Sequence, residues 1–375
     1  MKFVVQSNLL LNRLQLVGKV ILTKNIIPIL DCFLFQLSGN KLIITSSDTE
    51  TRMNTYIEVQ EVEGVGEFAI TSKNLLDALR ELPNQLITFE MNITTCEVFI
   101  YYKNGKYNFI SQNGSEYPVF RPLQKDIHSL TMNIEDLLTA ISYTLFAAGN
   151  DELRPIMSGI FFEITPKYIA FVSSDGHRLS RFKKLNMSEN VPSSFIFPKK
   201  PANLLRSILL REKGEITINF DLNYAHINLQ NFTLISRLLE GNYPDYNSVI
   251  PSENPYKIVI NRLELLNALK RVNLFSDPGN NLIKLQILTN KIILTAQDID
   301  YSISAEEFIT CNYTGNNIII GFKGIYLIEI LNSILSEKII LELADASRAG
   351  LIIPVKSSEN DEDLLMLLMP IMLST

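Results

Sequence analysis

The sequence contains no tryptophan and only three cysteines, which stand far apart and form no Cys-x-x-Cys pair. Neither a disulfide framework nor a structural zinc site is indicated, so Cys32, Cys96 and Cys311 are predicted to be small core residues. Apolar runs are short: Leu9–Val17 is interrupted by polar residues and does not resemble a signal-peptide core. A protein that stays in the cytoplasm is expected.

Positive charge is not in excess, since the formal net charge is -6. This composition argues against nucleic-acid binding through a uniformly basic surface, because counterion release requires clustered lysine and arginine. A local basic face remains compatible with this composition.

Signatures of catalysis are also missing. Neither a phosphate-binding nor a dinucleotide-binding glycine loop occurs, and the three histidines are 49 residues apart at each step, without metal-ligand spacing. Ser174, Asp175 and His177 offer the residue types of a hydrolase triad, but neighbours on one turn generally point apart. No carboxylate cluster indicates polymerase chemistry. No catalytic residue, cofactor or metal is predicted.

A threefold internal repeat is present instead. The segments FVVQSNLLLNRLQLVGKV, TMNIEDLLTAISYTLFAAG and IVINRLELLNALKRVNLF align, with Leu10, Leu138 and Leu266 separated by 128 residues each. Strand-like runs in the three segments end near Asp48, Asp175 and Asp298, and a second helical stretch follows in each, with Lys73, Lys200 and Lys323 near its start. Each repeat is therefore predicted to contain two helices.

The periodicity of each repeat indicates helices packed on sheets. Leu10, Leu14, Val17 and Ile21 form one apolar helical stripe, with Ser7 as the predicted N-cap. Many short runs rich in Val, Ile, Tyr, Phe and Thr, separated by turn residues, predict antiparallel strands. The predicted fold class is α+β, in three domains at 1–125, 126–252 and 253–375. The repeat alone is equally compatible with a structural or ligand-binding protein.

Four stretches carry a more specific resemblance: MKFVVQSNLLLNRL with Ile27-Pro28-Ile29-Leu30, SSDGHRLSR at Ser173–Arg181, EGNYPDYNSVIP at Glu240–Pro251, and the ending Met369-Pro370-Ile371-Met372-Leu373. In this order and at these spacings the chain resembles the beta sliding clamp family of bacterial DNA polymerase III. The resemblance implies a non-catalytic processivity subunit that closes around duplex DNA as a head-to-tail homodimer. Tyr107 and Phe109 of one subunit are implied to meet Leu274 and Phe275 of the other.

The predicted helices carry basic residues that fit a DNA-lining surface. Such residues would contact phosphates without reading bases, which permits sliding. The expected DNA contacts are Lys24, which matches a family position and is favoured most, with Arg13, Lys19, Lys73, Lys199, Lys200, Arg206, Arg262, Lys270, Arg271 and Lys323. Exposed helix faces commonly carry such residues, so an ordinary solvated surface is the alternative for each. The first helix of the central repeat opens with Glu135 and Asp136 and has no basic residue.

The family also implies a cleft, between the second and third domains, that binds short peptides of the polymerase, the clamp loader and other partners. Its matching positions are Arg154, Met157, Ser174, Gly176, His177, Arg178, Leu179, Pro244, Tyr246, Val249, Leu367, Met369, Pro370, Ile371 and Met372. Methionine adapts its shape, and leucine, valine and proline supply apolar area. Ordinary core packing is the alternative for Leu367 and Met369. The family often has a basic residue near Met372, so peptide preference is expected to differ here.

Two further expectations concern function and surface charge. A ring or repeat scaffold that binds only proteins is the alternative function, and retention on duplex DNA would discriminate between the two. Acidic residues such as Glu61, Glu63, Asp361, Glu362 and Asp363 are expected on the outer surface, where they would keep DNA to the hole, or in a simple solvated loop.

Overall fold

The computed structural model describes residues 1–120, 122–124, 126–151, 153–187, 189, 191–355 and 361–373. Two compact units are present, one formed by residues 1–138 with 200–238 and the other by 139–199 with 239–375. Lys125, where the first predicted domain ends, lies outside the described residues. In the described part of the chain no helix is both long and apolar enough to cross a bilayer.

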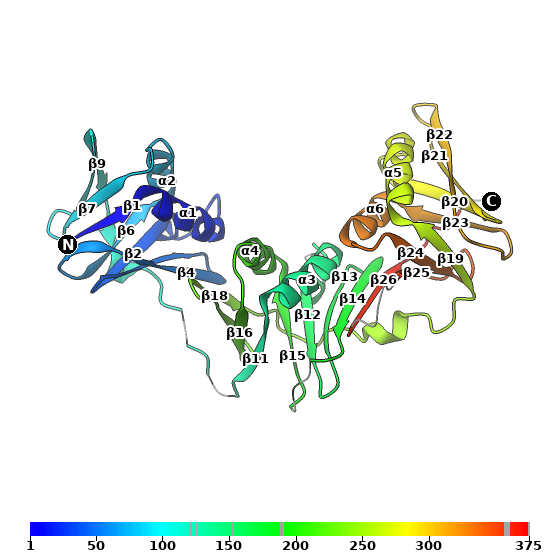
Figure 1. Cartoon of the computed structure of the whole chain (residues 1–375), viewed down its shortest axis with the longest axis horizontal. Coiled ribbons are helices and arrows are strands. Elements are labelled where there is room, and N and C mark those ends of the chain that lie inside the picture. The colour runs from blue at the N-terminus through cyan, green and yellow to red at the C-terminus, as the bar shows by residue number, and fades with distance from the viewer. Residues whose placement is uncertain are drawn as a thin grey trace. The chain divides into compact units, whose positions relative to one another are not determined.

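Within the described residues, six α-helices confirm the expectation of two per repeat (Figure 1). In each repeat one helix follows the first strand and another follows a later strand, so the pattern strand–helix recurs at matching places. The first helices are α1 (Ser7–Val17), α3 (Ile134–Thr144) and α5 (Arg262–Val272), and the second helices are α2 (Ser72–Arg80), α4 (Lys199–Leu209) and α6 (Gly324–Ser333).

The first unit contains two antiparallel sheets. One has five strands in the order β5-β1-β7-β8-β9, and the other has nine in the order β10-β6-β2-β3-β4-β18-β17-β16-β11. The strands are β1 (Lys2–Gln6), β2 (Cys32–Ser38), β3 (Lys41–Ser47), β4 (Thr51–Glu58), β5 (Gln60–Glu63), β6 (Gly66–Thr71), β7 (Leu86–Asn92), β8 (Glu97–Tyr102), β9 (Gly105–Ile110), β10 (Gln112–Asn113), β11 (His128–Asn133), β16 (Glu215–Phe220), β17 (Tyr224–Asn228) and β18 (Phe232–Arg237).

The second unit has an eight-stranded sheet in the order β15-β12-β13-β14-β26-β25-β24-β19 and a four-stranded sheet in the order β22-β21-β20-β23. Both are antiparallel. Their strands are β12 (Gly159–Ile164), β13 (Ile169–Ser174), β14 (Arg178–Lys184), β15 (Ser193–Pro198), β19 (Tyr256–Asn261), β20 (Leu282–Leu288), β21 (Lys291–Asp298), β22 (Ile303–Thr310), β23 (Ile318–Lys323), β24 (Lys338–Leu343), β25 (Gly350–Pro354) and β26 (Glu362–Leu368).

The two largest sheets join strands of neighbouring repeats. In the first unit β4 pairs with β18, and in the second β14 pairs with β26 from Arg178↔Leu368 to Lys184↔Glu362. The strands of the central repeat are thus divided between the units. The α+β class with three repeats is confirmed, while the predicted boundaries at 126 and 253 stay predictions.

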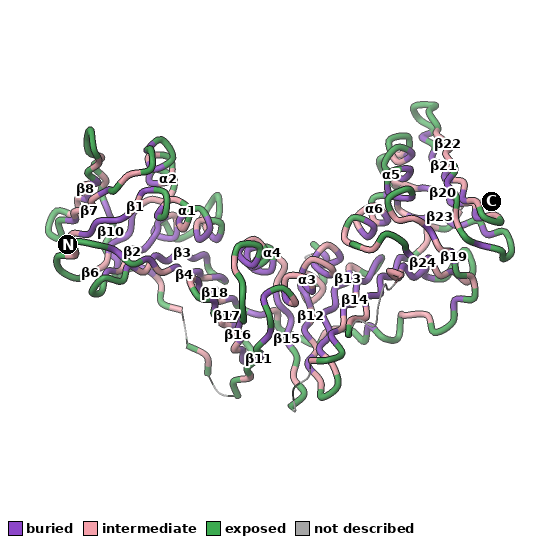
Figure 2. The backbone as a smooth tube through the Cα atoms, viewed as in Figure 1, coloured by how far each residue is buried: buried purple, intermediate pink, exposed green. Residues whose placement is uncertain are grey.

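The apolar core follows the predicted pattern, and burial runs along the strands and inner helix faces (Figure 2). Leu10, Leu14 and Val17 are fully buried on α1, but α1 ends at Val17, so Ile21 does not belong to its stripe. Helix α1 packs on α2, and α5 packs on α6. These contacts give each amphipathic helix a place for its apolar face.

Two local predictions were wrong, and one of two alternatives for an acidic segment does not hold. Gln6, not Ser7, is the N-cap of α1; the Ser7 hydroxyl donates to Pro83 O at 3.0 Å instead. Cys32 is buried, but Cys96 and Cys311 are only half-buried. Asp361 precedes β26, and Glu362 and Asp363 begin that strand, where they pair with Lys184 and Arg181 rather than lying in a solvated loop.

Candidate functional site

Four segments of the second unit bring most of the predicted cleft residues together. They are a 3-10 turn at Pro155–Met157, the turn between β13 and β14, a 3-10 turn at Tyr246–Val249, and the end of β26. Leu179 and Leu367 face one another across β14 and β26, and Met369 N donates to His177 O at 2.8 Å. Segments more than 180 residues apart in sequence are therefore joined by a strand pairing.

A buried apolar cluster forms the base of this site. Leu179, Tyr246 and Leu367 pack in it with residues of β13, β25 and β26, and Phe161 and Tyr243 stack against its edge at a ring separation of 4.8 Å. The Tyr246 hydroxyl donates to Glu163 at 2.6 Å. Burial raises the pKa of Tyr246, and the hydrogen bond to Glu163 raises it further. The phenol therefore stays neutral and fixed.

The rim of the site is exposed. Val249 is 56% exposed and Met369 42% exposed, whereas Leu367 is 3% exposed. Pro244, His177 and Arg154 are also exposed. Leu367 is thus both a core residue and part of the base, while Met369 is free to contact a ligand. Adaptable and apolar groups above a packed base suit the binding of an extended peptide.

The turn after β13 is held by its aspartate. Asp175 Oδ1 accepts hydrogen bonds from His177 N at 2.9 Å and Arg178 N at 3.0 Å, while Oδ2 accepts one from Arg178 Nε at 3.0 Å. The Arg178 guanidinium also pairs with Glu329 of α6 and donates to Phe146 O at 2.8 Å. A nearly buried arginine thus connects the turn to a helix of the third repeat.

Gly176 in the same turn has φ +88°, a left-handed conformation that glycine adopts without strain. A Cβ added there would lie 2.7 Å from a guanidinium nitrogen of Arg154. Arg154 is held by Asp151 at 2.9 Å and donates to Asp175 O at 3.3 Å. Glycine therefore allows an arginine to cover the turn at the edge of the site.

The same geometry separates the residue types of a hydrolase triad. The Ser174 hydroxyl donates to Arg178 O at 2.8 Å and accepts from Gly176 N at 3.1 Å, and Asp175 binds the Arg178 guanidinium and the backbone amide of His177. The serine is 9% exposed and is used within its own turn. These contacts serve the turn and place no base beside a nucleophile.

Several residues of this site were missed by the sequence prediction. Phe161, Glu163, Leu351, Tyr326 and Glu329 all contact predicted residues. Tyr243 belongs to the quoted stretch EGNYPDYNSVIP and was therefore within reach. The others lie on strands and a helix, and nothing in the local pattern links them to the site.

About half of the predicted basic residues are engaged within the chain. Arg13 lies 3.9 Å from Glu212 and 4.8 Å from the centre of the Phe232 ring. Arg262 donates to Leu331 O and Ser336 O, at the end of α6. The others are Lys199, which donates to Ala148 O, Lys200, which pairs with Asp48, Arg271, which pairs with Glu307, and Lys323, which lies over the Tyr326 ring. Their charges are partly offset.

Five other predicted basic residues are exposed and form no ion pair with the described part of the chain. They are Lys19 and Lys24 after α1, Lys73 on α2, Arg206 on α4 and Lys270 on α5. All five lie on or beside helices. Such side chains are able to meet phosphate groups without first breaking an internal pair.

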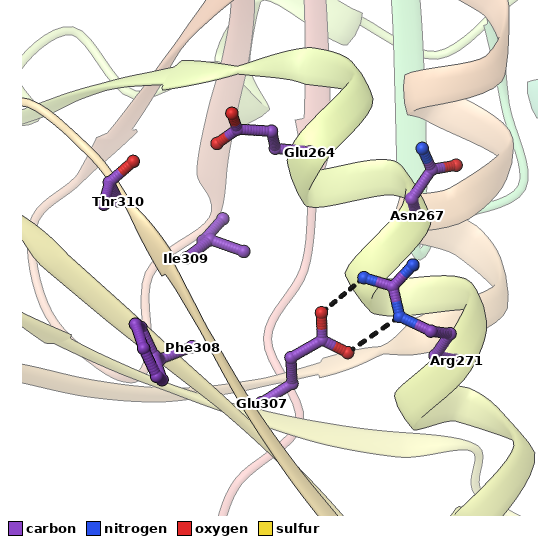
Figure 3. Close-up of a pocket in the computed structure, with 7 residues that line it drawn as sticks. All are labelled: Glu264, Asn267, Arg271, Glu307, Phe308, Ile309 and Thr310. Carbon is purple, nitrogen blue, oxygen red and sulfur yellow. Dashed lines mark hydrogen bonds and ion pairs between the residues drawn. The ribbon is translucent and has the colours of Figure 1, made fainter.

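The predicted subunit contacts lie at free sheet edges. Tyr107 and Phe109 are on β9, the last strand of the five-stranded sheet, and their rings are 6.4 Å apart. Leu274 and Phe275 follow α5, near β22, the last strand of the four-stranded sheet, and are 77% and 38% exposed. Between α5 and β22 lies a pocket of about 380 Å³, where Arg271 and Glu307 pair beside Phe308 (Figure 3). Unpaired edges and exposed apolar residues indicate an interaction surface.

Comparison with known proteins yields matches over nearly the whole chain. Models of the N-terminal, central and C-terminal domains of the DNA polymerase III beta subunit match residues 1–121, 131–245 and 247–372. The beta sliding clamp of Haemophilus influenzae is 27% identical and that of Bacillus subtilis 26% identical, with 97% or more of each chain covered. The crystal structure of the DNA polymerase III subunit beta from Pseudomonas aeruginosa superposes with a TM-score of 0.92 at 25% identity, over 100% of both chains.

Proposed function

Because this chain belongs to the DNA polymerase III beta subunit family, we propose that it is a sliding clamp, which confers processivity on a replicative polymerase and catalyses no reaction itself. The observation that carries this proposal is the match of all three domain models in order along one chain. A cytoplasmic location follows from this role. We take the domains as 1–125, 126–252 and 253–375.

The clamp closes as a head-to-tail homodimer in this proposal. The free edge of β9, with Tyr107 and Phe109, meets Leu274 and Phe275 near the free edge of β22 in the second subunit. Support comes from the position of both surfaces at sheet edges and from the exposure of Leu274. Apolar contacts would supply most of the association free energy, and pairing of the edges would satisfy backbone groups.

Duplex DNA is held through its phosphates, without base readout. We favour Lys24, Lys19, Lys73, Arg206 and Lys270 as the contacts, because these side chains are exposed and engaged in no ion pair with the described residues. The six engaged residues from the same prediction are weaker candidates, since each would have to give up an internal interaction. Loose, screened contacts allow the ring to move along DNA.

Polymerase, clamp-loader and other partner proteins dock through the cleft residues of the second unit. Leu179, Tyr246 and Leu367 would form its base, and Val249 and Met369 its exposed rim. Pro370 and Ile371 continue the wall toward Met372. A short linear peptide is the ligand that suits such a surface, because its backbone and alternate side chains can follow a shallow site.

Topological retention on DNA tests the proposal directly. The protein is loaded by a bacterial clamp loader onto nicked circular DNA, isolated, and followed at moderate salt before and after the DNA is linearised. Retention on circles and loss from linear ends would establish encirclement. Equal loss from both forms would refute the clamp and leave the protein-only scaffold.

A paired variant tests closure in the same assay. Leu274→Asp places a charge at an exposed subunit contact, and Leu335→Asp places one at a residue that is 79% exposed and outside that contact. Leu274→Asp is expected to shift the protein to the monomer in size-exclusion chromatography and to abolish retention. Leu335→Asp should behave as the unmodified protein.

A further inference from the structure

A small pocket in the first unit is built from the same kinds of segment as the candidate cleft of the second unit. Its wall includes parts of the 3-10 turn Pro28–Asp31, the turn between β3 and β4, and residues 118–120. The candidate cleft uses the 3-10 turn Pro155–Met157, the turn between β13 and β14, and residues 244–249. Three of the four cleft segments thus recur in the first unit.

The repeat relates the two sites position by position. Both sites combine a Tyr-Pro dipeptide, a 3-10 turn that begins with proline, and a turn that begins with aspartate. The matched pairs are Ile27 with Arg154, Leu30 with Met157, Thr49 with Gly176, Pro118 with Pro244, and Phe120 with Tyr246. Five residues that line the pocket therefore stand at the places of predicted cleft residues.

The wall of the pocket is held in place from within the first unit. The Tyr117 hydroxyl donates to Cys32 O at 3.3 Å, and Tyr117 packs in the buried cluster that contains Leu30. The Arg52 guanidinium donates to Pro118 O at 3.1 Å, at the start of the wall. The pocket is therefore formed before any ligand binds, so little ordering of this wall is needed on binding.

The charge of the lining is already compensated. Among the described residues that line the pocket, Asp48 is the only acidic or basic one. Its Oδ1 accepts from Glu50 N at 2.7 Å and Thr51 N at 2.6 Å, and its Oδ2 pairs with Lys200. Such a lining complements an uncharged occupant, because a charged group would lose water without gaining a partner.

Apolar side chains of the lining are left uncovered. Val119 is 87% exposed and Ile27 is 43% exposed, whereas Leu30 is 1% exposed. The rings of Phe120 and Tyr224 meet edge to face, with their centroids 6.1 Å apart. A bulky apolar side chain in the pocket would remove this apolar surface from water, which is favourable in proportion to the area covered.

The size of the pocket limits what it can hold. Sites for drug-sized ligands span roughly 300–1,000 Å³, and stable interfaces between folded proteins bury roughly 1,200–2,000 Å². The pocket has a volume of about 240 Å³, which suits neither. It also lacks the apolar base of the cleft, because Arg52 stands four residues after Asp48, where Leu179 stands four residues after Asp175. A single side chain of an extended segment fits these limits.

We propose that this pocket binds one leucine or phenylalanine side chain of a partner's peptide, as a second and smaller docking site of the chain. The inference rests on the proposed function, because the class of partner, a protein with a short linear motif, is that of the cleft. A partner with two motifs joined by a flexible linker would engage both sites. Such a partner gains overall affinity through effective concentration, provided that its linker spans the two sites.

The probe is selected on a chain whose cleft is disabled. A displayed library of twelve-residue peptides is panned on full-length Val249→Asp, because Val249 is exposed on the cleft rim. One selected peptide is labelled with fluorescein and titrated by polarisation with the unmodified protein, with Val119→Asp and with Val65→Asp. Val65 is 67% exposed on the same unit and does not line the pocket, so Val65→Asp is the matched control. A second peptide carries alanine in place of the shared apolar residue.

Peptides selected in this way are expected to share one leucine or phenylalanine. Val119→Asp should weaken binding by about tenfold, because it places a charge beside the bound apolar side chain, and Val65→Asp should leave the affinity unchanged. The alanine peptide should also bind about tenfold more weakly. Asp245 stands at the matching position of the second unit, so Val119→Asp is expected to fold normally.

Two results would overturn the inference: no peptide enriched on Val249→Asp, or equal affinity of the selected peptide for Val119→Asp and the unmodified protein. A second pool of peptides, selected on the unmodified protein, tests the cleft separately. Peptides of that pool that lose affinity for Val249→Asp should keep it for Val119→Asp, which also shows that Val119→Asp is folded. If none of them loses affinity for Val249→Asp, the cleft of the proposed function fails, whereas the pocket fails only through the first two results.

Discussion

The turns at Asp175 and Asp298 hold the same place in the central and third repeats, but only one of them is neutralised by its own chain. In the Asp175 turn, the Arg178 guanidinium pairs with the second carboxylate oxygen of Asp175 and also with Glu329. In the other, no cation of the described residues meets Asp298, which lines a pocket. The comparison separates two roles of the repeated aspartate. Its hydrogen bond to the backbone is common to the repeats, whereas the partner of its negative charge differs from one repeat to the next.

A fourth aspartate turn shows a third solution. Asp221, between β16 and β17, accepts from Asn223 N and Tyr224 N at 2.8 Å, and its other oxygen accepts from Gln124 N at 2.9 Å. Here backbone amides, not a cation, satisfy both oxygens. The four turns therefore form a series in which the compensation of the second carboxylate oxygen differs from turn to turn.

The largest effect is expected where the cation is most buried. Arg178→Met would leave Asp175 without its partner and remove the link to Glu329, and should lower the free energy of unfolding by about 3 kcal/mol. Urea denaturation measures this. Arg348→Met, which breaks an exposed pair with Asp345, is the control and should cost less than about 0.5 kcal/mol. Equal costs for the two variants would contradict the assigned role of Arg178.

A smaller loss is expected in the first repeat. Lys200 is 41% exposed, so solvent screens its pair with the buried Asp48. Lys200→Met should lower the free energy of unfolding by about 1 kcal/mol, because Asp48 keeps its two backbone donors. In a double-mutant cycle with Asp48→Asn, the two changes should be less than additive. Strict additivity would show that the pair contributes nothing.

The Asp221 turn predicts a dependence on pH. Burial raises the pKa of Asp221, but hydrogen bonds from Gln124, Asn223 and Tyr224 outweigh it and lower the pKa below the usual value. The native state then binds fewer protons than the unfolded state, so the contribution of Asp221 is complete above the unfolded pKa and is lost as pH falls through the folded one.

The difference in urea midpoint between the unmodified protein and Asp221→Asn should therefore be constant from pH 7 to about pH 5 and shrink below about pH 4, near the pKa of an unfolded aspartate. The matched charge-removal control is Asp126→Asn, at an exposed aspartate on the same unit. A difference that grows on acidification would contradict the direction of the shift.

The smallest effect on folding is expected at Asp298. Since this carboxylate has no cationic partner in the described residues, Asp298→Asn removes an uncompensated charge while keeping the acceptor for Tyr301 N. The free energy of unfolding should change by less than about 0.5 kcal/mol, or rise. A loss of unfolding free energy comparable with that of Arg178→Met would indicate an internal partner of Asp298. It would contradict the difference between the Asp175 and Asp298 turns.

Repeats and helices could be predicted from sequence because they depend on local periodicity. The leucine pairs placed α1, α3 and α5, and the later lysines placed the starts of α2, α4 and α6. Ser7 was misassigned because its hydroxyl bonds to Pro83, 76 residues away, which no capping pattern reveals.

The composition of the candidate site was reachable mainly through family resemblance. Local patterns mark Leu179 and Leu367 as apolar, but only the pairing of β14 with β26 brings them together. Glu329 and Phe161 had no local signal at all. Among the basic residues, Lys24 is exposed, whereas Arg13 lies near Glu212, which stands about 200 positions later in the sequence.

The pairing of β4 with β18 and of β14 with β26 has a practical consequence for dissecting the protein. A fragment cut at the repeat boundaries would leave both β18 and β14 as unpaired sheet edges, whose free backbone groups could pair with another chain. The repeats of the sequence are thus not expected to fold autonomously. Expression of the central repeat alone should therefore yield aggregates. Cutting the chain so that each sheet stays whole would instead divide the central repeat.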